Sequence, residues 1–387
     1  MKILFVHNRY QQAGGEDNVV AAEAKLLADH GHEVELWSVD NKDLPAGLTG
    51  KIKTAMTTSY SAASKAITSD KLQSFKPAVV HVHNFFPQIS PSIYDACQEA
   101  GVPVVQTLHN YRLICPGAML MRDGKICEQC ITGSPYQAAW YGCYRNSKLG
   151  SLVVAHMVAQ HRKEDTWLHK VNRFIALTNF AKSKFVKAGF PADKIRVKAN
   201  FVHDPLQESP DVDRTLPAFA LFVGRLSEEK GLKTLLKAWS TMTDQTVLKI
   251  AGGGPLAELV SGKNNIEALG LQDAKQISAL MQEAAFLVLP SEWYEGFPLV
   301  LVEAFAHGLP VLASNLGSMA DIIKDGETGL LFTPCNADDL ASKAKWLLEN
   351  PLKAQMLGDK ARRTFLEKYT AEQNYVEQMA IYEDAMA

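Results

Sequence analysis

Short apolar runs alternate with stretches of helical periodicity along most of the chain. In the first half these runs cover residues 2–8, 33–39, 78–84, 102–110, 173–178 and 195–202. In the second half they cover residues 218–225, 246–254, 264–270, 286–291, 309–314 and 329–332. Apolar strands separated by helices are typical of parallel sheets that are covered on both faces. The pattern therefore predicts an α/β protein with two doubly wound sheets in series.

A segment without periodicity divides the two series. Residues 203–217, "HDPLQESPDVDRTLP", are rich in Pro, Asp and Ser, which is typical of a linker. We expect an N-terminal Rossmann-like domain over residues 1–204 and a C-terminal one over residues 205–368. Residues 369–387 are expected to form a helix that packs back on the N-terminal domain. Two such domains predict a ligand site in a central cleft that both face.

Composition and charge narrow the class of protein. The 387 residues are 47% hydrophobic and 21% charged, as in ordinary globular proteins. A formal charge of −2 supplies no basic field, so nucleic acid is not an expected partner. The chain holds no apolar run of roughly 18–20 residues, and "MKILFVHNRY" is too short in apolar residues for a signal peptide. We therefore expect a cytoplasmic protein whose six cysteines stay reduced.

Cationic and glycine residues follow two strands of the second series. Arg225 and Lys230 lie in "VGRLSEEKG", just past the first of these strands, and Gly253 lies in "AGGGP" after the next. Ligands bind at the carboxyl ends of parallel strands, and a guanidinium with an ammonium there suits a phosphate. Two solvated surface cations, and a tight strand-to-helix turn at the glycines, remain the alternatives.

Two carboxylates flank a predicted helix start in "SEWYEGFPLVLVEAFAHGLPVLASN", residues 291–315. Glu295 lies in a turn beside Gly296, and Glu303 lies within the helix. Free N–H groups at the helix start would bind an anion, while the carboxylates would accept hydrogen bonds from sugar hydroxyls. This arrangement indicates a nucleotide-sugar diphosphate. A buried, partnered Glu303 or one on the helix surface is the alternative.

The combination of "VGRLSEEKG", "AGGGP", "SEWYEGFPLVLVEAFAHGLPVLAS" and "DGETGLLF" closely resembles the family-4 glycosyltransferases, retaining enzymes of the GT-B fold. The spacing from Glu295 to Glu303 matches the paired-glutamate motif of that family, a glutamate followed by seven residues and a second glutamate. The resemblance covers essentially the whole chain and is strongest from residue 220 to residue 335.

The resemblance implies a role for each matching residue. Arg225 and Lys230 would bind the donor diphosphate and stabilise it as it leaves, Glu295 would hold hydroxyls of the transferred sugar, and Glu303 would bind the ribose. His109 would lie near the donor sugar, although a histidine in a strand end is by itself more often structural. The backbone near the donor would come from Gly14, Gly15, Gly253, Gly270, Gly296, Phe297, Pro298, Leu299 and Val300.

The implied reaction is the transfer of a sugar, with retention, from a UDP- or GDP-sugar to a hydroxyl of a sugar or lipid-linked glycan acceptor. The implied setting is the assembly of a polysaccharide or another glycoconjugate. The Asp-x-Asp pattern occurs only at residues 211–213, in the linker, so we expect no cofactor for catalysis and cationic side chains in place of a divalent ion. A nucleotide-sugar epimerase of the same fold and a non-catalytic nucleotide-sugar-binding protein are the alternatives.

Two further stretches carry separate hypotheses. The insertion at residues 113–145 holds Cys115, Cys127, Cys130 and Cys143, which could form a tetrahedral structural zinc site or remain free thiols. It could also shape the acceptor pocket. Residues 51–67 are amphipathic and slightly basic, which fits either peripheral contact with the inner face of a membrane or a solvated helix face.

Overall fold

The computed structural model of the chain describes residues 1–11, 14–44, 47–206, 219–242 and 246–387. Residues 207–217 of the expected linker, with the Asp-x-Asp pattern, lie outside these ranges. The chain divides into two compact units. Unit 1 comprises Met1–Arg122, Cys127–Ala199 and Asn374–Ala387, and unit 2 comprises Asp123–Ile126 and Asn200–Gln373.

Unit 1 is built on a parallel sheet of six strands, in the order β2-β1-β3-β4-β7-β8. The order reverses between β1 and β3, a switch point at which ligands bind in doubly wound sheets. The strands are β1 (Lys2–Arg9), β2 (Glu33–Asp40), β3 (Val79–Asn84), β4 (Val104–Leu108), β7 (Arg173–Ala176) and β8 (Ile195–Val197).

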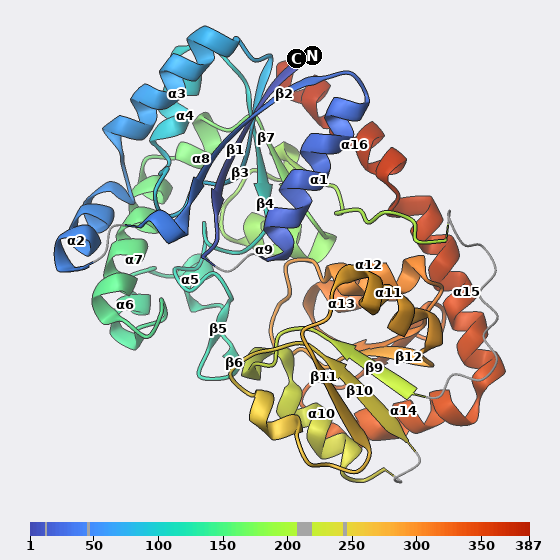
Figure 1. Cartoon of the computed structure of the whole chain (residues 1–387). Coiled ribbons are helices and arrows are strands. Elements are labelled where there is room, and N and C mark those ends of the chain that lie inside the picture. The colour runs from blue at the N-terminus through green and yellow to red at the C-terminus, as the bar shows by residue number, and fades with distance from the viewer. Residues whose placement is uncertain (12–13, 45–46, 207–218, 243–245) are drawn as a thin grey trace. The chain divides into compact units, whose positions relative to one another are not determined.

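One face of this sheet packs against the helices α1 (Gly15–Asp29) and α16 (Ala371–Met386) (Figure 1). Alternate residues of a strand point to opposite faces, so Val79, His81 and His83 of β3 share a face. Val79 belongs to the apolar core beneath α1 and α16, which places both histidines under these helices. The core residues are Ile3, Phe5, Val20, Leu27, Val79, Val105, Ile175, Ile381, Tyr382 and Ala385.

The remaining helices of unit 1 precede or follow these strands. The stretch 51–67 is two helices, because α2 ends at Thr57 and the Ser61 side chain caps the start of α3 at Ala62. The others are η1 (Asn41–Asp43), α2 (Gly47–Thr57), α3 (Ala62–Phe75), α4 (Ser92–Glu99), α7 (Lys148–Lys163), α8 (Thr166–His169), α9 (Asn179–Lys187) and η2 (Ala192–Lys194).

The insertion after β4 is ordered by short elements that the sequence pattern did not predict. Two-residue strands, β5 (Met121–Arg122) and β6 (Lys125–Ile126), pair with each other. Two short helices follow, α5 (Gln129–Thr132) and α6 (Gln137–Tyr141). Arg162 of α7 donates to the carbonyl oxygens of Gly133 and Cys130, both at 3.0 Å, and so fixes the insertion to that helix.

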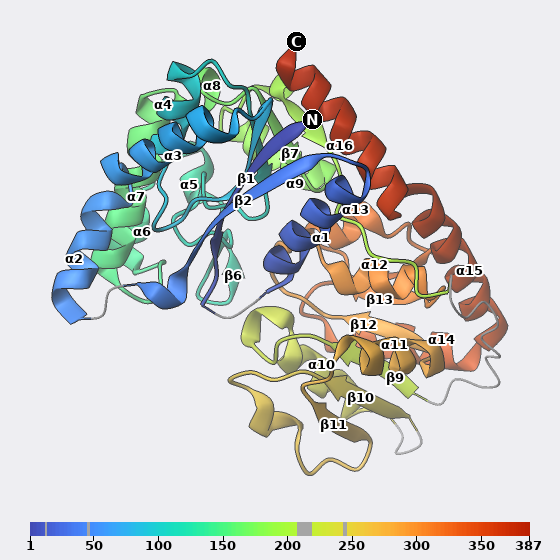
Figure 2. The same ribbon diagram turned by 45° about the horizontal axis from the view of Figure 1, so that its top comes forward.

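Unit 2 contains a second parallel sheet, in the order β11-β10-β9-β12-β13-β14, which reverses between β9 and β12 (Figure 2). The prediction of two doubly wound sheets is therefore confirmed. The strands are β9 (Phe219–Val223), β10 (Val247–Ala251), β11 (Ile266–Gly270), β12 (Phe286–Leu289), β13 (Val311–Ser314) and β14 (Gly329–Phe332).

The helices of unit 2 bury an apolar core that includes Phe222, Trp239, Phe286 and Leu340. They are η3 (Glu228–Lys230), α10 (Leu232–Trp239), η4 (Ala257–Val260), α11 (Ala274–Glu283), α12 (Leu299–Ala306), α13 (Gly317–Ile322), α14 (Ala337–Glu349) and α15 (Pro351–Lys368). Among the described residues no helix combines the length and the apolar character that crossing a membrane requires.

Candidate active site

The switch point of unit 2 brings together residues that the sequence places about seventy positions apart. Strands β9 and β12 are neighbours and run in the same direction, so their carboxyl ends lie at one edge of the sheet. Arg225 and Lys230 follow β9, and the loop from Pro290 to Pro298 follows β12. The Arg225 side chain is exposed at this edge.

Lys230 and Glu295 form an ion pair at this edge. The ammonium Nζ donates to Oε1 of Glu295 at 2.7 Å, and the Ser291 hydroxyl donates to the same oxygen at 2.7 Å. Glu295 is only 6% exposed, so its charge is held by these two partners and not by bulk water. The Lys230 ammonium also lies 5.8 Å from the centre of the Trp293 ring. The Lys230 ammonium and the Glu295 carboxylate therefore fix each other's position.

The glycine positions after β10 differ in how much room they leave for a side chain. A methyl group at Gly252 would lie 1.9 Å from the carbonyl oxygen of Gly224, so only glycine fits there. At Gly253 the nearest atoms are those of the Leu271 side chain, at 3.4 Å, and this side chain can move. Gly252 also donates to the carbonyl of Gly270 at 2.7 Å, which ties the ends of β10 and β11 together. Gly253 is therefore the residue of this turn that a ligand could approach.

The start of α12 has no side-chain cap. Pro298 occupies the N-cap position with an extended backbone, and the helix begins with Leu299 and Val300. The loop before it is fixed by the Ser318 hydroxyl, which donates to the carbonyl of Gly296 at 3.0 Å, and by the Phe297 ring, 6.2 Å from that of Tyr369. The first amides of an uncapped helix can bind an anion.

Glu303 lies just over one turn into α12 and is half-buried. Burial raises the pKa of its carboxyl, and no other cause contributes to the shift. No described cation lies close enough to form an ion pair with it. Glu303 is therefore a half-buried carboxyl without an ion-pair partner among the described residues.

In unit 1, Gly14 and Gly15 lie between β1 and the body of α1. Gly14 has φ −128°, a value that any residue adopts, and a methyl group added to it would meet nothing within 4 Å. Its N–H donates to Oδ2 of Asp17 at 3.1 Å. Gly15 is exposed as the first residue of the helix. The packing around position 14 therefore leaves room for a side chain.

His109 follows β4, one strand from the switch point of unit 1. Its Nε2 lies 3.0 Å from Nδ1 of His83, and the two rings stack with centres 5.3 Å apart. Burial lowers the pKa of His109 to about 3, so the imidazole is neutral near pH 7. Both histidines line a small cavity of about 20 Å³ together with Arg112, room for about one water molecule.

Two acidic residues next to the glycine pair were not singled out from the sequence. The Tyr10 hydroxyl donates to Glu16 at 2.8 Å, and burial raises the pKa of Glu16 to about 8. Asp17 lies 2.7 Å from Nε2 of His7. The signal was present, because "GGED" places two acids in the first turn of a helix that starts at a strand's carboxyl end.

The four cysteines of the insertion lie in one region but are not in metal-binding contact. Cys115 and Cys130 are buried, and Cys127 and Cys143 are partly exposed. Burial raises the pKa of Cys130 to about 12, with smaller contributions from the other three thiols. In the described part of the chain, the side chains whose ligand atoms lie mutually within 4.8 Å are Glu23, His81 and His83. No three of the four thiols are that close.

Both units match family models built from glycosyltransferases. Residues 13–204 match the model described as Glycosyltransferase Family 4, and residues 210–364 match the model described as Glycosyl transferases group 1. The two matches leave residues 1–12, 205–209 and 365–387 uncovered.

Curated relatives match over part of their length. The chain is 35% identical over 148 residues to the MMP alpha-(1->4)-mannosyltransferase of Mycolicibacterium hassiacum, which is 37% of this chain and 36% of that protein. It is 36% identical over 163 residues to the D-rhamnosyltransferase WbpZ of Pseudomonas aeruginosa, which is 40% of this chain and 42% of that protein. The match therefore spans less than half the length of these two relatives.

Solved structures share the fold over the full length. HepE of Anabaena, solved in complex with UDP and glucose, aligns over 98% of both chains with a TM-score of 0.66 and 19% identity. At this identity the likeness shows the fold, which is GT-B.

Proposed function

We propose that this chain transfers a sugar with retention from a nucleotide-diphosphate sugar to a hydroxyl acceptor. The matches of both units to glycosyltransferase family models support a family-4-like glycosyltransferase. The observation that carries the proposal is the pair Lys230–Glu295 at the switch point of unit 2. It sets a cation for the diphosphate beside a carboxylate for the sugar hydroxyls, next to the uncapped start of α12. The curated relatives named above, both of them transferases of sugars, support the same reaction class.

The proposed mechanism follows from where charge develops. Breaking the bond between the sugar and the nucleotide leaves an additional negative charge on the diphosphate. Arg225, Lys230 and the amides of Leu299 and Val300 would stabilise that charge, with Gly253 and Gly296 allowing the backbone to approach. Glu303 would accept from the ribose hydroxyls. Glu295 is already engaged by Lys230 and Ser291, which favours a hydrogen-bonding role over that of a covalent nucleophile.

The donor is proposed to be a UDP- or GDP-sugar, and the acceptor a glycan or lipid-linked glycan in glycoconjugate assembly. The binding of UDP and glucose by HepE, which shares the fold, supports a nucleotide sugar as donor. The base would pass near Gly270, at the end of β11. Gly14, Gly15 and His109 of unit 1 would act on the donor sugar.

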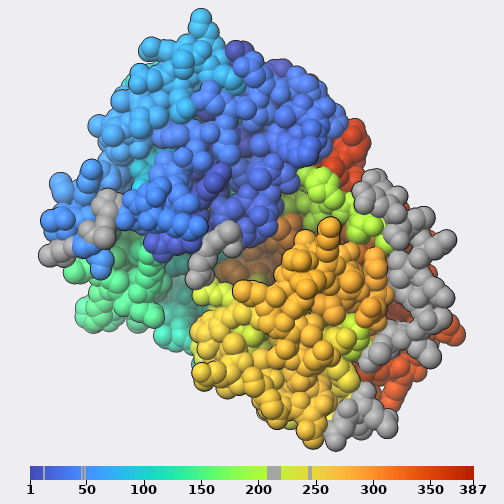
Figure 3. All heavy atoms as spheres, viewed as in Figure 1, coloured from blue at the N-terminus to red at the C-terminus, as the bar shows by residue number. Residues whose placement is uncertain are grey.

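We further propose that unit 1 makes peripheral contact with a membrane surface. Ile52 and Met56, four residues apart on α2, are 52% and 77% exposed, and Trp140 of α6 is 78% exposed. Lysines 51 and 53 of α2 are exposed beside them. Figure 3 shows the surface of α2 next to that of α6 and α7 on one face of unit 1. Exposed aromatic and aliphatic side chains among cations suit the interfacial region of an anionic bilayer.

The insertion is proposed to bind a structural zinc ion through Cys115, Cys127, Cys130 and Cys143. Thiolates in a tetrahedral zinc site lie about 2.3 Å from the metal, so binding would draw the sulfur atoms closer together than they are here. The location of all four in one ordered region supports this proposal.

A thermal-shift screen against UDP, GDP, ADP and their common sugar conjugates tests the proposed function. We expect one nucleotide to raise Tm and the Glu303→Ala variant to lose most of that rise, because the ribose hydroxyls lose their acceptor. The transfer reaction is then followed with and without acceptor. Product formed from the donor alone would indicate an epimerase, and no shift with any nucleotide would favour a protein without this chemistry.

A further inference from the structure

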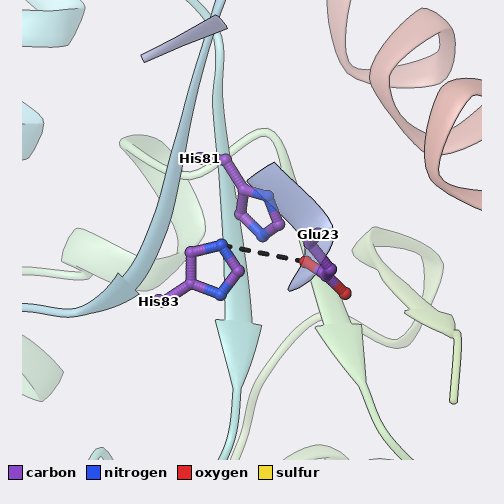
Figure 4. A group of neighbouring side chains, drawn as sticks. All are labelled: Glu23, His81 and His83. Atoms are coloured by element: carbon purple, nitrogen blue, oxygen red, sulfur yellow. Dashed lines mark ion pairs between the residues drawn. The ribbon is translucent and has the colours of Figure 1, made fainter. Parts of the chain in front are cut away.

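Three buried polar residues lie together between the sheet of unit 1 and the helices α1 and α16 that cover it. Glu23 comes from α1, and His81 and His83 come from β3 (Figure 4). Glu23, His81 and His83 are 2%, 0% and 3% exposed as whole residues. Their ligand atoms lie within 4.8 Å of one another, a spacing that could also suit a metal ion. The hydrogen bonds of the cluster indicate a different role.

The cluster already has a cation. The ammonium of Lys198, itself 1% exposed, lies 2.6 Å from Oε1 of Glu23. Burial is the largest influence on Glu23 and opposes its ionisation, but the charge and hydrogen bond of Lys198, together with contributions from His81 and His109, lower the pKa of this carboxyl overall. The pair is thus Glu23⁻ with Lys198⁺, and a divalent ion beside the ammonium would be repelled.

His81 has no nitrogen left for a metal. Its Nδ1 lies 2.8 Å from the Tyr382 hydroxyl, and its Nε2 lies 2.7 Å from the Thr107 hydroxyl. Burial lowers the pKa of His81 and that of His83 well below the usual value, so both rings are neutral. His81 is therefore a structural histidine that joins β3 to β4 and α16.

His83 has one nitrogen that faces Glu23. Its Nε2 lies 3.8 Å from Oε2 of Glu23, and neither atom has a hydrogen-bond partner in the described part of the chain. A protonated Nε2 would point its N–H dipole at the carboxylate, whereas an unprotonated one would set a lone pair against it. The carboxylate therefore selects the Nε2–H form of His83, which leaves Nδ1 of His83 as an acceptor.

The tautomer of His83 determines the tautomer of His109. The atom that faces Nδ1 of His83, at 3.0 Å, is Nε2 of His109. Because Nδ1 of His83 accepts, Nε2 of His109 must donate and carry the proton. In a neutral ring the other nitrogen, Nδ1 of His109, is then an acceptor.

We propose that Glu23 and His83 are positioning residues that hold His109 as its Nε2–H tautomer, so that Nδ1 of His109 accepts a hydrogen bond from a hydroxyl of the donor sugar. This inference rests on the proposed function, since it assigns His109 its partner on the substrate. Lys198 keeps Glu23 ionised as a carboxylate. Two polar side chains of α16 also contact this cluster: Oδ1 of Asn374 lies 3.2 Å from Nζ of Lys198, and Nε2 of Gln378 lies 3.4 Å from Nδ1 of His81.

The tautomer is measured directly by long-range proton–nitrogen NMR on the full chain labelled with ¹⁵N-histidine, without any ligand. His109→Gln assigns the signals. We expect His109 with a protonated Nε2 and an unprotonated Nδ1 in the wild type. The His83→Asn variant should keep this tautomer, because the amide oxygen can stand where Nδ1 stood. The His83→Phe variant should give a mixture of the two tautomers.

The matched control is His81→Phe, a buried histidine two residues away on the same strand and face. Both phenylalanine variants should lose Tm to a similar extent. Only His83→Phe should also lower kcat/KM, by about 10-fold or more for one lost hydrogen bond at the reacting sugar, with nucleotide binding unchanged and with recovery in His83→Asn.

Three outcomes would overturn the inference. The first is an NMR spectrum of the wild type that shows His109 protonated at Nδ1, or as a mixture of the two tautomers. The second is an equal loss of kcat/KM in both phenylalanine variants that follows Tm. The third is one equivalent of a transition metal that co-purifies with the wild type and is lost in both variants. Absence of any sugar transfer by the wild type would count against the proposed function instead, because the tautomer is read without substrate.

Discussion

The ammonium of Lys230 lies 2.7 Å from a carboxylate oxygen of Glu295, although 64 residues separate the two in the chain. Lys230 is partly exposed and Glu295 is buried, so the pair lies at the boundary between the protein and its solvent. The carboxylate holds the ammonium in place before any donor binds. In the proposed function, a diphosphate that approached Lys230 would therefore meet a preorganised cation, which is the arrangement that makes electrostatic stabilisation effective.

Replacing Lys230 by alanine should lower the rate of sugar transfer by roughly 10²–10³-fold, the usual cost of removing a charge that stabilises a transition state. Tm should fall by only a few degrees, because Ser291 still donates to Glu295. The control is Lys233→Ala, because in the wild type the Lys233 ammonium pairs with Glu228 at 2.5 Å in an exposed position. Steady-state kinetics and calorimetry of both variants give the comparison. Transfer by Lys230→Ala within about threefold of the wild type would show that the pair is structural.

The two types of glycine at the strand ends give a second prediction. In Gly14→Ala the new methyl group would meet nothing within 4 Å, so stability should change by less than about 1 kcal/mol. Transfer should nevertheless drop about 10-fold or more, because the methyl group would occupy space that the donor needs. In Gly252→Ala the methyl group would lie 1.9 Å from the carbonyl oxygen of Gly224, so unit 2 should be strongly destabilised. Thermal unfolding and activity of both variants test this, and unimpaired transfer by Gly14→Ala would remove the proposed role of Gly14.

The strands were predictable from the sequence because a parallel sheet with both faces covered requires continuous apolar runs. Each of the twelve predicted runs overlaps a strand of one of the two sheets. The insertion was not predictable in the same way, since elements of two to five residues such as β5 and α6 are too short to show a period. The division of residues 51–67 into two helices did leave a sign, the capping residue Ser61.

Contacts between side chains on different strands could not be read from the sequence. Lys230 and Glu295 were assigned separately, one to the phosphate and one to the sugar, and only the adjacency of β9 and β12 shows that they are partners. The pairing of His83 with His109 depends likewise on the register of β3 against β4. The motif "VVHVHN" does show that His81 and His83 share a face, because strand residues alternate.

The cysteine insertion gives a third prediction. Wild-type protein purified without chelators should contain about one zinc ion per chain by elemental analysis, and the variant with Cys127→Ser and Cys130→Ser should contain none. Removing the metal should lower Tm of the wild type, because structural zinc contributes directly to folding. Cys335→Ser, an exposed cysteine outside the insertion, is the control and should keep its zinc. Wild-type protein free of zinc would end the proposal and leave the thiols as part of an ordinary ordered loop.

Glu16 gives a prediction about pH. Burial raises the pKa of its carboxyl from 4.5 to about 8, against the hydrogen bond from Tyr10. Between these values the folded protein keeps a proton that the unfolded chain has lost. The contribution of Glu16 to stability is therefore complete below pH 4.5 and falls as pH rises towards 8, at about 1.4 kcal/mol for each pH unit at most.

Glutamine resembles the protonated form of Glu16 but cannot ionise. Glu16→Gln should thus match the wild type in Tm below pH 4.5. Its Tm should exceed that of the wild type increasingly up to pH 8, by several degrees for a compact unit as large as unit 1. Calorimetry at several pH values measures the difference. The control is Glu258→Gln, an exposed glutamate of unit 2, for which we expect a small difference at every pH. A Tm difference for Glu16→Gln that does not grow with pH would mean that Glu16 is ionised in the folded protein. In that case Glu16 would present a negative charge, and not a neutral carboxyl, beside the glycine pair.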